Sequence, residues 1–155
     1  MIPKTIHYCW FGKSSKSKLA EKCIASWKKY CPDWEIIEWN EDNFDVNIIP
    51  YTAEAYKLKK YAFVSDYARF WILYKYGGLY FDTDVEVIKP MDDIIARGPF
   101  MGCENSAQPG ATPKNLGFAP GCALFSHPLN GPRAIMSSIG FITSTSVSKY
   151  KPPYL

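Results

Sequence analysis

Hydrophobic and polar positions predict strands and helices in turn along the first ninety residues. The β-branched and aromatic run Lys4–Trp10 predicts a first strand, and Glu35–Trp39 predicts a second. Between them, apolar residues recur at steps of three and four, which predicts a helix that Ser17 caps and Pro32 ends. The apolar positions of this helix are Leu19, Cys23, Ile24, Trp27 and Cys31.

A second group of elements follows. Thr52–Lys60 predicts a short helix, and Val64–Tyr76 predicts a longer one that is apolar on nearly all sides and therefore buried. Gly77 and Gly78 end that helix, because glycine adopts the left-handed conformation of a helix C-cap. Leu79–Ile88 then predicts a strand.

The pattern weakens in the last third of the chain. Phe100–Glu104 and Gly121–Ser126 predict short strands, and the glycine- and proline-rich stretch between them is typical of a flexible loop over a site. Arg133–Ile139 predicts a last helix. We therefore expect one domain over residues 1–140 and a weakly packed tail over 141–155. Strands that alternate with helices favour an α/β fold with a mostly parallel, mixed central sheet and flanking helices.

Composition narrows the class of protein. The chain has 155 residues, of which 47% are hydrophobic and 16% aromatic, so it is a globular domain and not a disordered or coiled-coil chain. Its net charge of +3 is too mild to predict a nucleic-acid partner. Five cysteines without metal-binding spacing, and a start without the blocks of a signal peptide, favour a soluble protein of the reducing cytoplasm.

Two carboxylates carry the candidate chemistry. Asp82 and Asp84 follow a helix, a glycine pair and a hydrophobic strand start, so we expect them at the carboxyl end of a central strand, where α/β sheets bind ligands. On a strand they share a face with Tyr80 and Glu86, and their carboxylates lie about 6.6 Å apart. Their repulsion, roughly 2–3 kcal/mol, is reversed by a shared cation. Hard oxygens without histidine or cysteine favour Mg²⁺ or Mn²⁺. A half-buried strand with its polar face in water is the alternative.

Asp66 and Arg69 are a second candidate pair. They lie three residues apart, and therefore on one face of an otherwise apolar helix. A buried charge needs a partner, which a sugar hydroxyl or a phosphate can supply. The alternative is a surface ion pair, which contributes little to stability.

Three blocks of sequence resemble a known family. IPKTIHYCWFG at 2–12, SDYARFWILYKYGGLYFDTDVEVIKP at 65–90 and NLGFAPGCALFSHPLNGP at 115–132 resemble the DXD-containing glycosyltransferases of family 32. That family includes bacterial capsular-polysaccharide sugar transferases and the fungal mannosyltransferase that initiates outer chains. The glucosylating domain of the large clostridial toxins is a more distant relative.

The resemblance implies a fold of the GT-A type and a retaining, metal-dependent transfer of a hexose. The donor is a nucleotide sugar such as a UDP- or GDP-hexose. The acceptor is a glycan or a lipid-linked sugar in polysaccharide or capsule biosynthesis. Family members of the capsule type act in the cytoplasm near the inner membrane, so the resemblance also implies peripheral membrane association.

The resemblance further implies roles for single residues. Asp84 coordinates Mn²⁺ or Mg²⁺ on the donor diphosphate, and Asp82 contacts the ribose or sugar and also the metal. Asp66 and Arg69 hold donor-sugar hydroxyls, with Arg69 also near the departing phosphate. Trp10 stacks on the nucleotide base, which suits its flat ring; without the family pattern, a core tryptophan is the better interpretation. Tyr80, on the face of Asp82, contacts the site.

Two other functions stay open. Family members continue well past the glycine–proline pair at 131–132, whereas this chain ends at Leu155 with no carboxylate after Glu104. An inactive or truncated nucleotide-sugar-binding remnant is therefore the first alternative. The second is a haloacid-dehalogenase-type phosphatase, whose nucleophile motif is also D-x-D after a hydrophobic strand. It needs a later lysine and an acidic pair; Lys114 is present, but the acidic residues stop at Glu104.

Overall fold

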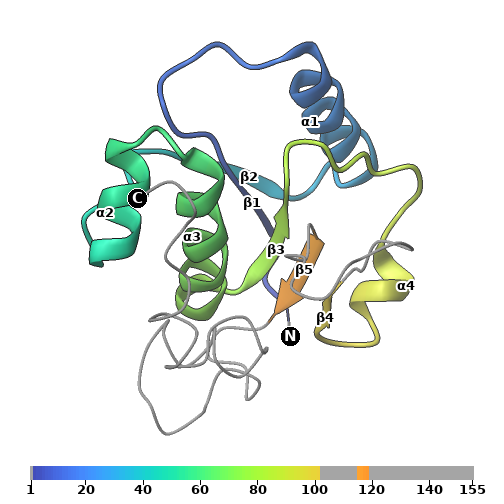
Figure 1. The fold of residues 1–155 in the computed structure, drawn as a ribbon. Coiled ribbons are helices and arrows are strands. Elements are labelled where there is room, and N and C mark those ends of the chain that lie inside the picture. The colour runs from blue at the N-terminus through green and yellow to red at the C-terminus, as the bar shows by residue number, and fades with distance from the viewer. Residues whose placement is uncertain (1, 102–114, 119–155) are drawn as a thin grey trace, which may run out of the picture.

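The computed structural model describes residues 2–101 and 115–118. In that part of the chain a five-stranded mixed sheet, in the order β2-β1-β3-β5-β4, carries helices on both faces (Figure 1). The strands are β1 (Thr5–Cys9), β2 (Glu35–Trp39), β3 (Gly78–Phe81), β4 (Phe100–Met101) and β5 (Asn115–Phe118). The helices are α1 (Lys18–Tyr30), α2 (Pro50–Lys57), α3 (Tyr61–Tyr76) and α4 (Asp92–Ile95).

The parallel half of the sheet brings three strand ends to one edge. β1 pairs in parallel with β2 and with β3, while β5 pairs antiparallel with β3 and β4. The predicted α/β fold with a mixed sheet and flanking helices is confirmed. Because β1, β2 and β3 run the same way, Trp10, Asn40 and Asp82, which directly follow them, lie at the same edge.

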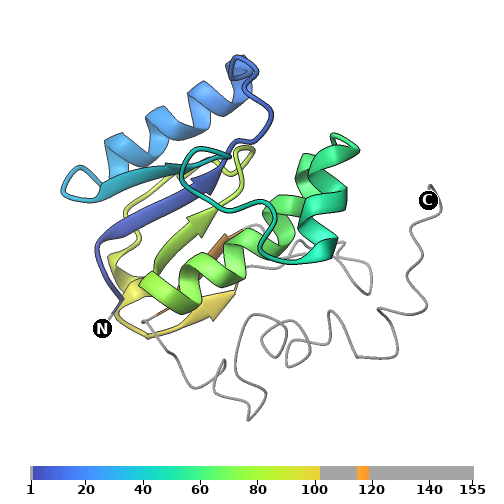
Figure 2. The ribbon, with the colours of Figure 1, turned by 90° about the vertical axis from the view of Figure 1, so that its left-hand side faces the viewer.

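Each face of the sheet has its own apolar core. Figure 2 shows α1 on one face and α2 and α3 on the other. Alternate residues of β1 separate accordingly, because successive side chains of a strand point to opposite faces. Ile6 and Tyr8 pack with Trp27 of α1, whereas Cys9 packs with α3 residues such as Phe70. Strand β1 is thus held by packing on both of its faces.

The first helix forms as predicted, with one exception. Ser17 is the N-cap of α1, and its hydroxyl accepts a hydrogen bond from the amide of Ala20 at 3.1 Å. The side of the helix that faces the sheet runs through Ala20, Cys23 and Trp27. Leu19, predicted among the apolar positions, is 54% exposed, because it lies beside that line and not on it.

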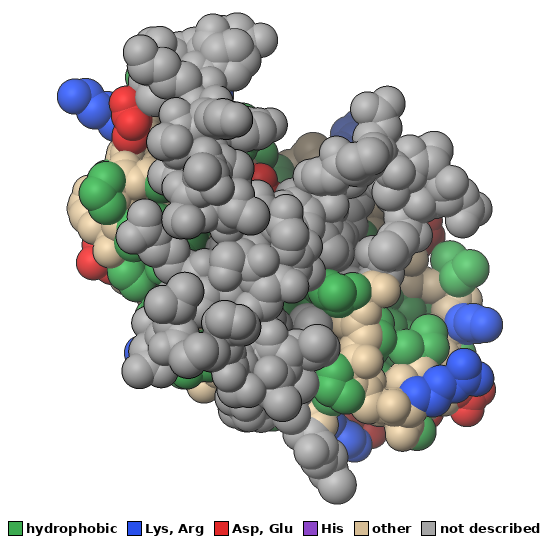
Figure 3. Space-filling view, turned by 60° about the horizontal axis from the view of Figure 1, so that its bottom comes forward, with side chains coloured by type: hydrophobic (Ala, Val, Ile, Leu, Met, Phe, Trp, Pro, Cys, Tyr) green, Lys and Arg blue, Asp and Glu red, His purple; other side chains and the backbone are tan. Residues whose placement is uncertain are grey.

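The predicted boundaries of the next two helices are shifted. α2 begins at Pro50, since proline suits the first helical position, and ends at Lys57. α3 is buried along the sheet but not all round: Phe63, Tyr74 and Tyr76 are 39%, 37% and 43% exposed. On the face drawn in Figure 3, too, hydrophobic side chains reach the surface among basic and acidic ones.

The prediction of a strand as far as Ile88 is wrong. β3 ends at Phe81, and the amide of Val85 donates to the carbonyl of Asp82 at 3.0 Å, which closes a turn. Side chains of helix α1 form hydrogen bonds with the backbone groups that a longer strand would pair with a neighbouring strand. The indole of Trp27 donates to the Val85 carbonyl at 2.8 Å, and the Ser26 hydroxyl accepts from the Val87 amide at 2.9 Å. Asp82 and Asp84 therefore do not share a strand face.

The last third is described only in part. β4 covers the first two residues of the strand predicted over 100–104, and α4 was not predicted. β5 lies inside the stretch predicted as a loop; it pairs with β3 and buries Leu116. The strand predicted over 121–126, the helix over 133–139 and the tail over 141–155 lie outside the described residues. No helix in the described part is long and apolar enough to cross a membrane.

Candidate functional site

The candidate site lies at the carboxyl end of β3, on the face of the sheet that α3 covers. The guanidinium of Arg69 lies between two carboxylates there. Its Nη1 donates to Oδ2 of Asp82 at 3.2 Å, and its Nη2 lies 3.1 Å from Oδ1 of Asp82 and 3.0 Å from Oδ1 of Asp66. The Arg69 side chain is only 4% exposed, against 23% for Asp82 and 26% for Asp66. The buried guanidinium of Arg69 thus forms ion pairs with two carboxylates that are partly exposed at the surface.

Further contacts fix the orientation of the guanidinium. Nε of Arg69 donates to the carbonyl of Ser65 at 3.2 Å, one helical turn back. The guanidinium carbon lies 4.9 Å from the centre of the Tyr80 ring, a cation–π contact. The Tyr80 hydroxyl donates to Oδ1 of Asp82 at 3.2 Å. Arg69 is therefore held by α3, by β3 and by the turn after β3.

Acidic side chains outnumber basic ones among the residues placed in the site. Burial alone lowers the pKa of Arg69, but Tyr80, Asp82 and Asp66 outweigh it and raise that pKa, so the guanidinium stays charged. Burial raises the pKa of Asp82, Arg69 opposes this shift, and Asp84 adds to it. The carboxylates of Asp66 and Asp82 contact the one guanidinium, and the charge of Asp84 acts on Asp82. Acidic side chains gathered in this way favour the approach of a cation, or of a ligand that brings one.

Cys9 lies behind the cluster, and the sequence reasoning missed it. It is the last residue of β1 and is 7% exposed. Burial raises the pKa of its thiol to about 12, although hydrogen bonding to Tyr80 and the charge of Arg69 oppose this shift. Cys9 is therefore a neutral packing residue and not a nucleophile. Alternation along β1 places Cys9 on the face of the sheet that α3 covers, so the sequence did contain a signal for its position.

Trp10 and Asp84 lie at the same edge of the sheet as the cluster. The Trp10 ring packs against the core on the α1 face, whereas Cys9 and Tyr80 belong to the core on the α3 face. Trp10 follows β1 directly; its backbone amide donates to the Trp39 carbonyl, and its indole Nε1 donates to the carbonyl of Ser14, both at 2.8 Å. Continued two residues beyond the pair of His7 with Tyr80, the β1–β3 register places Cys9 beside Asp82. Trp10 is thus one residue further along the same edge. Asp84 is exposed in the turn after β3.

The donor set fits a hard divalent cation that arrives with a diphosphate. Both Asp82 oxygens already accept hydrogen bonds from Arg69 or Tyr80, whereas Asp84 lies at the surface of the turn. Among the described residues, no group of three or more histidine, cysteine or acidic side chains could hold a metal alone. Mg²⁺ commonly uses one or two carboxylates and takes its other ligands from substrate phosphates and water. Asp84 suits that arrangement best.

The structure brings together four of the residues that the sequence singled out. Asp66, Arg69, Tyr80 and Asp82 form one connected cluster. The predicted shared helix face of Asp66 and Arg69 is present. The ion pair that the sequence left as the alternative to ligand binding is present too, although Arg69 is buried and not at the surface. The bridge from Arg69 to Asp82 was not predicted, because nothing in the spacing shows that α3 folds back on the end of β3. The roles of these residues in binding or catalysis stay predictions.

Comparison with known proteins gives a family for most of the described part. Residues 17–101 match the family described as glycosyltransferase sugar-binding region containing DXD motif. Inositol phosphoceramide mannosyltransferase 1 of Schizosaccharomyces pombe is 28% identical over an alignment of 111 residues that covers 64% of this chain and 33% of that protein. Inositol phosphoceramide mannosyltransferase 3 of the same yeast is 29% identical over an alignment of 128 residues that covers 77% of this chain and 34% of that protein.

A solved structure shows the same fold. The PaToxG glycosyltransferase superimposes with a TM-score of 0.61 at 18% identity, over 79% of this chain and 57% of that one. The chain spans about a third of the length of the two curated relatives. The likeness extends to the sheet with its flanking helices.

Proposed function

Because this chain belongs to the family of glycosyltransferase sugar-binding regions that contain a DXD motif, we propose that it is the donor-binding part of a metal-dependent, retaining hexosyltransferase of family 32. The donor is a UDP- or GDP-hexose, and the acceptor is a glycan or a lipid-linked sugar. The observation that carries the proposal is the cluster at the end of β3. There a buried guanidinium and two carboxylates adjoin an exposed acidic turn.

The chain's own residues bind and orient the donor. Asp84 is the metal ligand, and Asp82 holds Arg69 and faces the ribose or sugar; as a second ligand, Asp82 would have to share an oxygen that Arg69 now contacts. Asp66 accepts from a hydroxyl of the donor sugar. Trp10 stacks on the base, one residue beyond the strand position beside Asp82. The bound Mn²⁺ or Mg²⁺ supplies positive charge that offsets the charge of the diphosphate.

Arg69 acts on the leaving group. In the transfer, the bond between the anomeric carbon and the β-phosphate oxygen breaks, and a bond to an acceptor hydroxyl oxygen forms. The acceptor loses its proton, and the nucleoside diphosphate departs with the bonding electrons. A guanidinium already held in place by Asp66, Asp82 and Tyr80 stabilises that growing negative charge without first having to reorganise.

The relatives indicate which substrates to try first. Both are named for mannose transfer to inositol phosphoceramide, a lipid. GDP-mannose with a lipid-borne acceptor is therefore the first pair, and a UDP-hexose with a capsular glycan is the second. We propose that the protein works in the cytoplasm at the periphery of a membrane. The free, buried thiols of Cys9, Cys23 and Cys31 are consistent with a reducing compartment.

One alternative still competes with this proposal. Family membership sets aside the phosphatase, but an inactive nucleotide-sugar-binding remnant would have the same cluster. Turnover separates the two. A remnant binds the nucleotide and neither hydrolyses nor transfers the sugar from any donor in a panel.

Calorimetry with Mn²⁺ and either UDP or GDP tests the proposal. We expect one nucleotide to bind, and Asp84→Ala to weaken that binding about tenfold or more while the chain stays folded, since Asp84 is exposed. Asp93→Ala, another exposed acidic residue on α4, is the matched control and should leave the affinity unchanged. Failure of both nucleotides to bind would refute donor binding. Equal affinities for Asp84→Ala and the unchanged chain would remove the metal role.

A further inference from the structure

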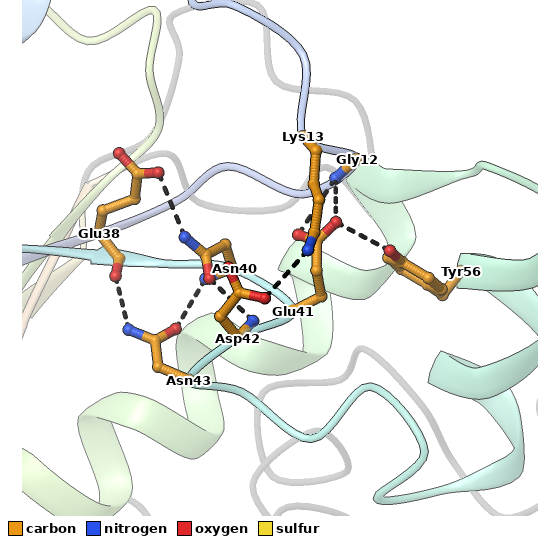
Figure 4. A network of polar contacts seen from close by, with 8 residues as sticks. All are labelled: Gly12, Lys13, Glu38, Asn40, Glu41, Asp42, Asn43 and Tyr56. Carbon is orange, nitrogen blue, oxygen red and sulfur yellow. Dashed lines mark hydrogen bonds and ion pairs between the residues drawn. The ribbon is translucent and has the colours of Figure 1, made fainter.

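A carboxylate outside the cluster holds the loop that carries Trp10. Glu41, in the loop after β2, accepts the amide of Gly12 with both of its oxygens, at 3.1 and 3.3 Å. The Tyr56 hydroxyl of α2 donates to Oε1 of Glu41 at 2.8 Å (Figure 4). Glu41 thereby connects three segments: the loop after β1, the loop after β2, and α2.

The backbone of the loop needs such support. Gly12 has a φ of +94°, and Lys13, which has a side chain, has a φ of +57°. The left-handed region costs a non-glycine residue free energy and persists only where its surroundings enforce it. A Cβ atom at residue 12 would also lie 2.2 Å from a ring atom of Tyr61, so α3 confines the same turn. The turn is held on one side by a ring and on the other by the Glu41 carboxylate.

The same turn sets the Trp10 ring. The indole Nε1 of Trp10 donates to the carbonyl of Ser14, four residues ahead on the loop that Glu41 holds through Gly12. If the Gly12–Ser14 turn relaxes, that carbonyl moves and the indole loses this hydrogen bond. The ring, which also packs against the core on the α1 face, then has fewer constraints on its orientation. Stacking depends on the orientation of the ring, because the base must meet its flat face.

We propose that Glu41 is a positioning residue for the nucleotide base: through Gly12 it holds the turn that orients Trp10. This inference rests on the proposed function, in which Trp10 stacks on the base. Glu41 acts on the loop and contacts no part of the Arg69 cluster in the described structure. Its removal should therefore weaken recognition of the base and leave recognition of the diphosphate intact.

The chain provides a matched control in the next residue. Asp42 also connects the two loops, through an ion pair of 3.1 Å with Lys13, visible beside Glu41 in Figure 4. Both side chains of that pair are largely exposed, at 67% and 72%, so it should contribute little. Asp42→Ala and Glu41→Ala remove neighbouring carboxylates that link the same loops, but only Glu41 holds the amide of Gly12.

The first experiment compares ligands with and without a base. Affinities for the preferred nucleotide, UDP or GDP, and for inorganic pyrophosphate are measured with Mn²⁺. We expect Glu41→Ala to weaken nucleotide binding about tenfold and pyrophosphate binding less than about twofold, as Trp10→Ala should. Glu41→Gln, whose amide oxygen can still accept from Gly12, should recover most of the affinity, and Asp42→Ala should match the unchanged chain.

The second experiment needs no ligand. Hydrogen exchange of the Gly12 amide and the Trp10 indole should accelerate about tenfold or more in Glu41→Ala, but not in Asp42→Ala, because only the first loses a hydrogen bond to Gly12. Unchanged exchange in Glu41→Ala overturns the inference, as does an equal loss of nucleotide and pyrophosphate affinity. If Trp10→Ala leaves nucleotide affinity unchanged, the stacking role assigned in the proposed function fails instead.

Discussion

The guanidinium of Arg69 reaches both carboxylate oxygens of Asp82, which lies 13 residues further along the chain on a different element. This two-point contact joins α3 to the turn after β3. It buries one charge almost completely and leaves its partner near the surface, where a ligand can reach it. The geometry of the candidate site therefore depends on this pair.

Removal of Arg69 should destabilise the fold, and removal of Asp82 in addition should restore part of the lost stability. Arg69→Met leaves two carboxylates around an apolar side chain and should lower the free energy of unfolding by roughly 3–5 kcal/mol. Adding Asp82→Asn removes one of the stranded charges, so the double variant should regain part of that loss. Urea denaturation of the two variants measures the difference.

The exposed ion pair between Lys22 and Glu86 is the control for this experiment. Lys22→Met should leave the urea midpoint close to that of the unchanged chain, because exposed pairs contribute little. If Arg69→Met is as mild as Lys22→Met, the cluster does not stabilise the fold.

Chelation should affect binding and not folding. With EDTA, the affinity for the nucleotide should fall about tenfold or more, and Mn²⁺ should restore it. The thermal midpoint of the ligand-free chain should not change, since the described fold rests on two apolar cores. Calorimetry and thermal melts measure the two effects separately. A fall of the melting temperature in EDTA would indicate a structural metal instead.

His7 should make stability depend on pH. It is 1% exposed and hydrogen-bonds to the Gly77 carbonyl and the Trp39 indole, each at 3.0 Å. Burial lowers its pKa to about 4, against a partly opposing effect of the Gly77 hydrogen bond. The unfolded chain binds this proton near pH 6.5 and the folded chain only near pH 4. The free energy of unfolding should therefore fall as the pH drops through that window, by about 3 kcal/mol in total from this group.

Denaturation of the unchanged chain and of His7→Gln at several pH values isolates this contribution. Other carboxyl groups also titrate near pH 4, so the difference between the two slopes is the relevant quantity. The variant should show a shallower dependence between pH 6.5 and pH 4. Parallel curves would show that His7 is accessible to protons in the folded state.

Gly78 and Gly98 have the same φ of +97°. Substitutions at the two positions therefore distinguish the cost of backbone strain from the cost of a steric clash. At Gly78, an added Cβ would lie 2.6 Å from the backbone oxygen of Thr5, whereas at Gly98 it would meet nothing within 4 Å. Gly98→Ala should cost only the conformational term, about 1–3 kcal/mol. Gly78→Ala should cost clearly more, because β1 must also move away from β3. Equal midpoints in thermal denaturation would mean that the strands adjust without cost.

The sequence was informative wherever local chemistry decides the outcome. Ser17 caps α1 and Glu35–Trp39 forms β2 as predicted, because hydroxyl capping and the strand preference of β-branched and aromatic residues act over a few positions. The mixed sheet followed from the order of the elements. The shared helix face of Asp66 and Arg69 followed from their spacing of three residues.

The failures share a cause, which is competition from distant groups. Leu79–Ile88 has the pattern of a strand, but Trp27 and Ser26 of α1 bind the backbone of its second half. β5 was missed because its pairing with β3 joins segments more than thirty residues apart. The Arg69–Asp82 bridge and the Glu41–Gly12 contact are likewise tertiary, so no periodic pattern of residues in the sequence predicts them.

The hydrogen bonds from α1 to the segment after β3 have a consequence for the candidate site. Trp27 and Ser26 sit on the opposite layer from Arg69, yet they decide the path of the chain on either side of Glu86. A substitution at either residue would change the path of the segment after β3, although both belong to the helix on the opposite face of the sheet from α3. The position of Asp84, the metal ligand proposed above, thus depends on residues behind the sheet as well as on the turn that carries it.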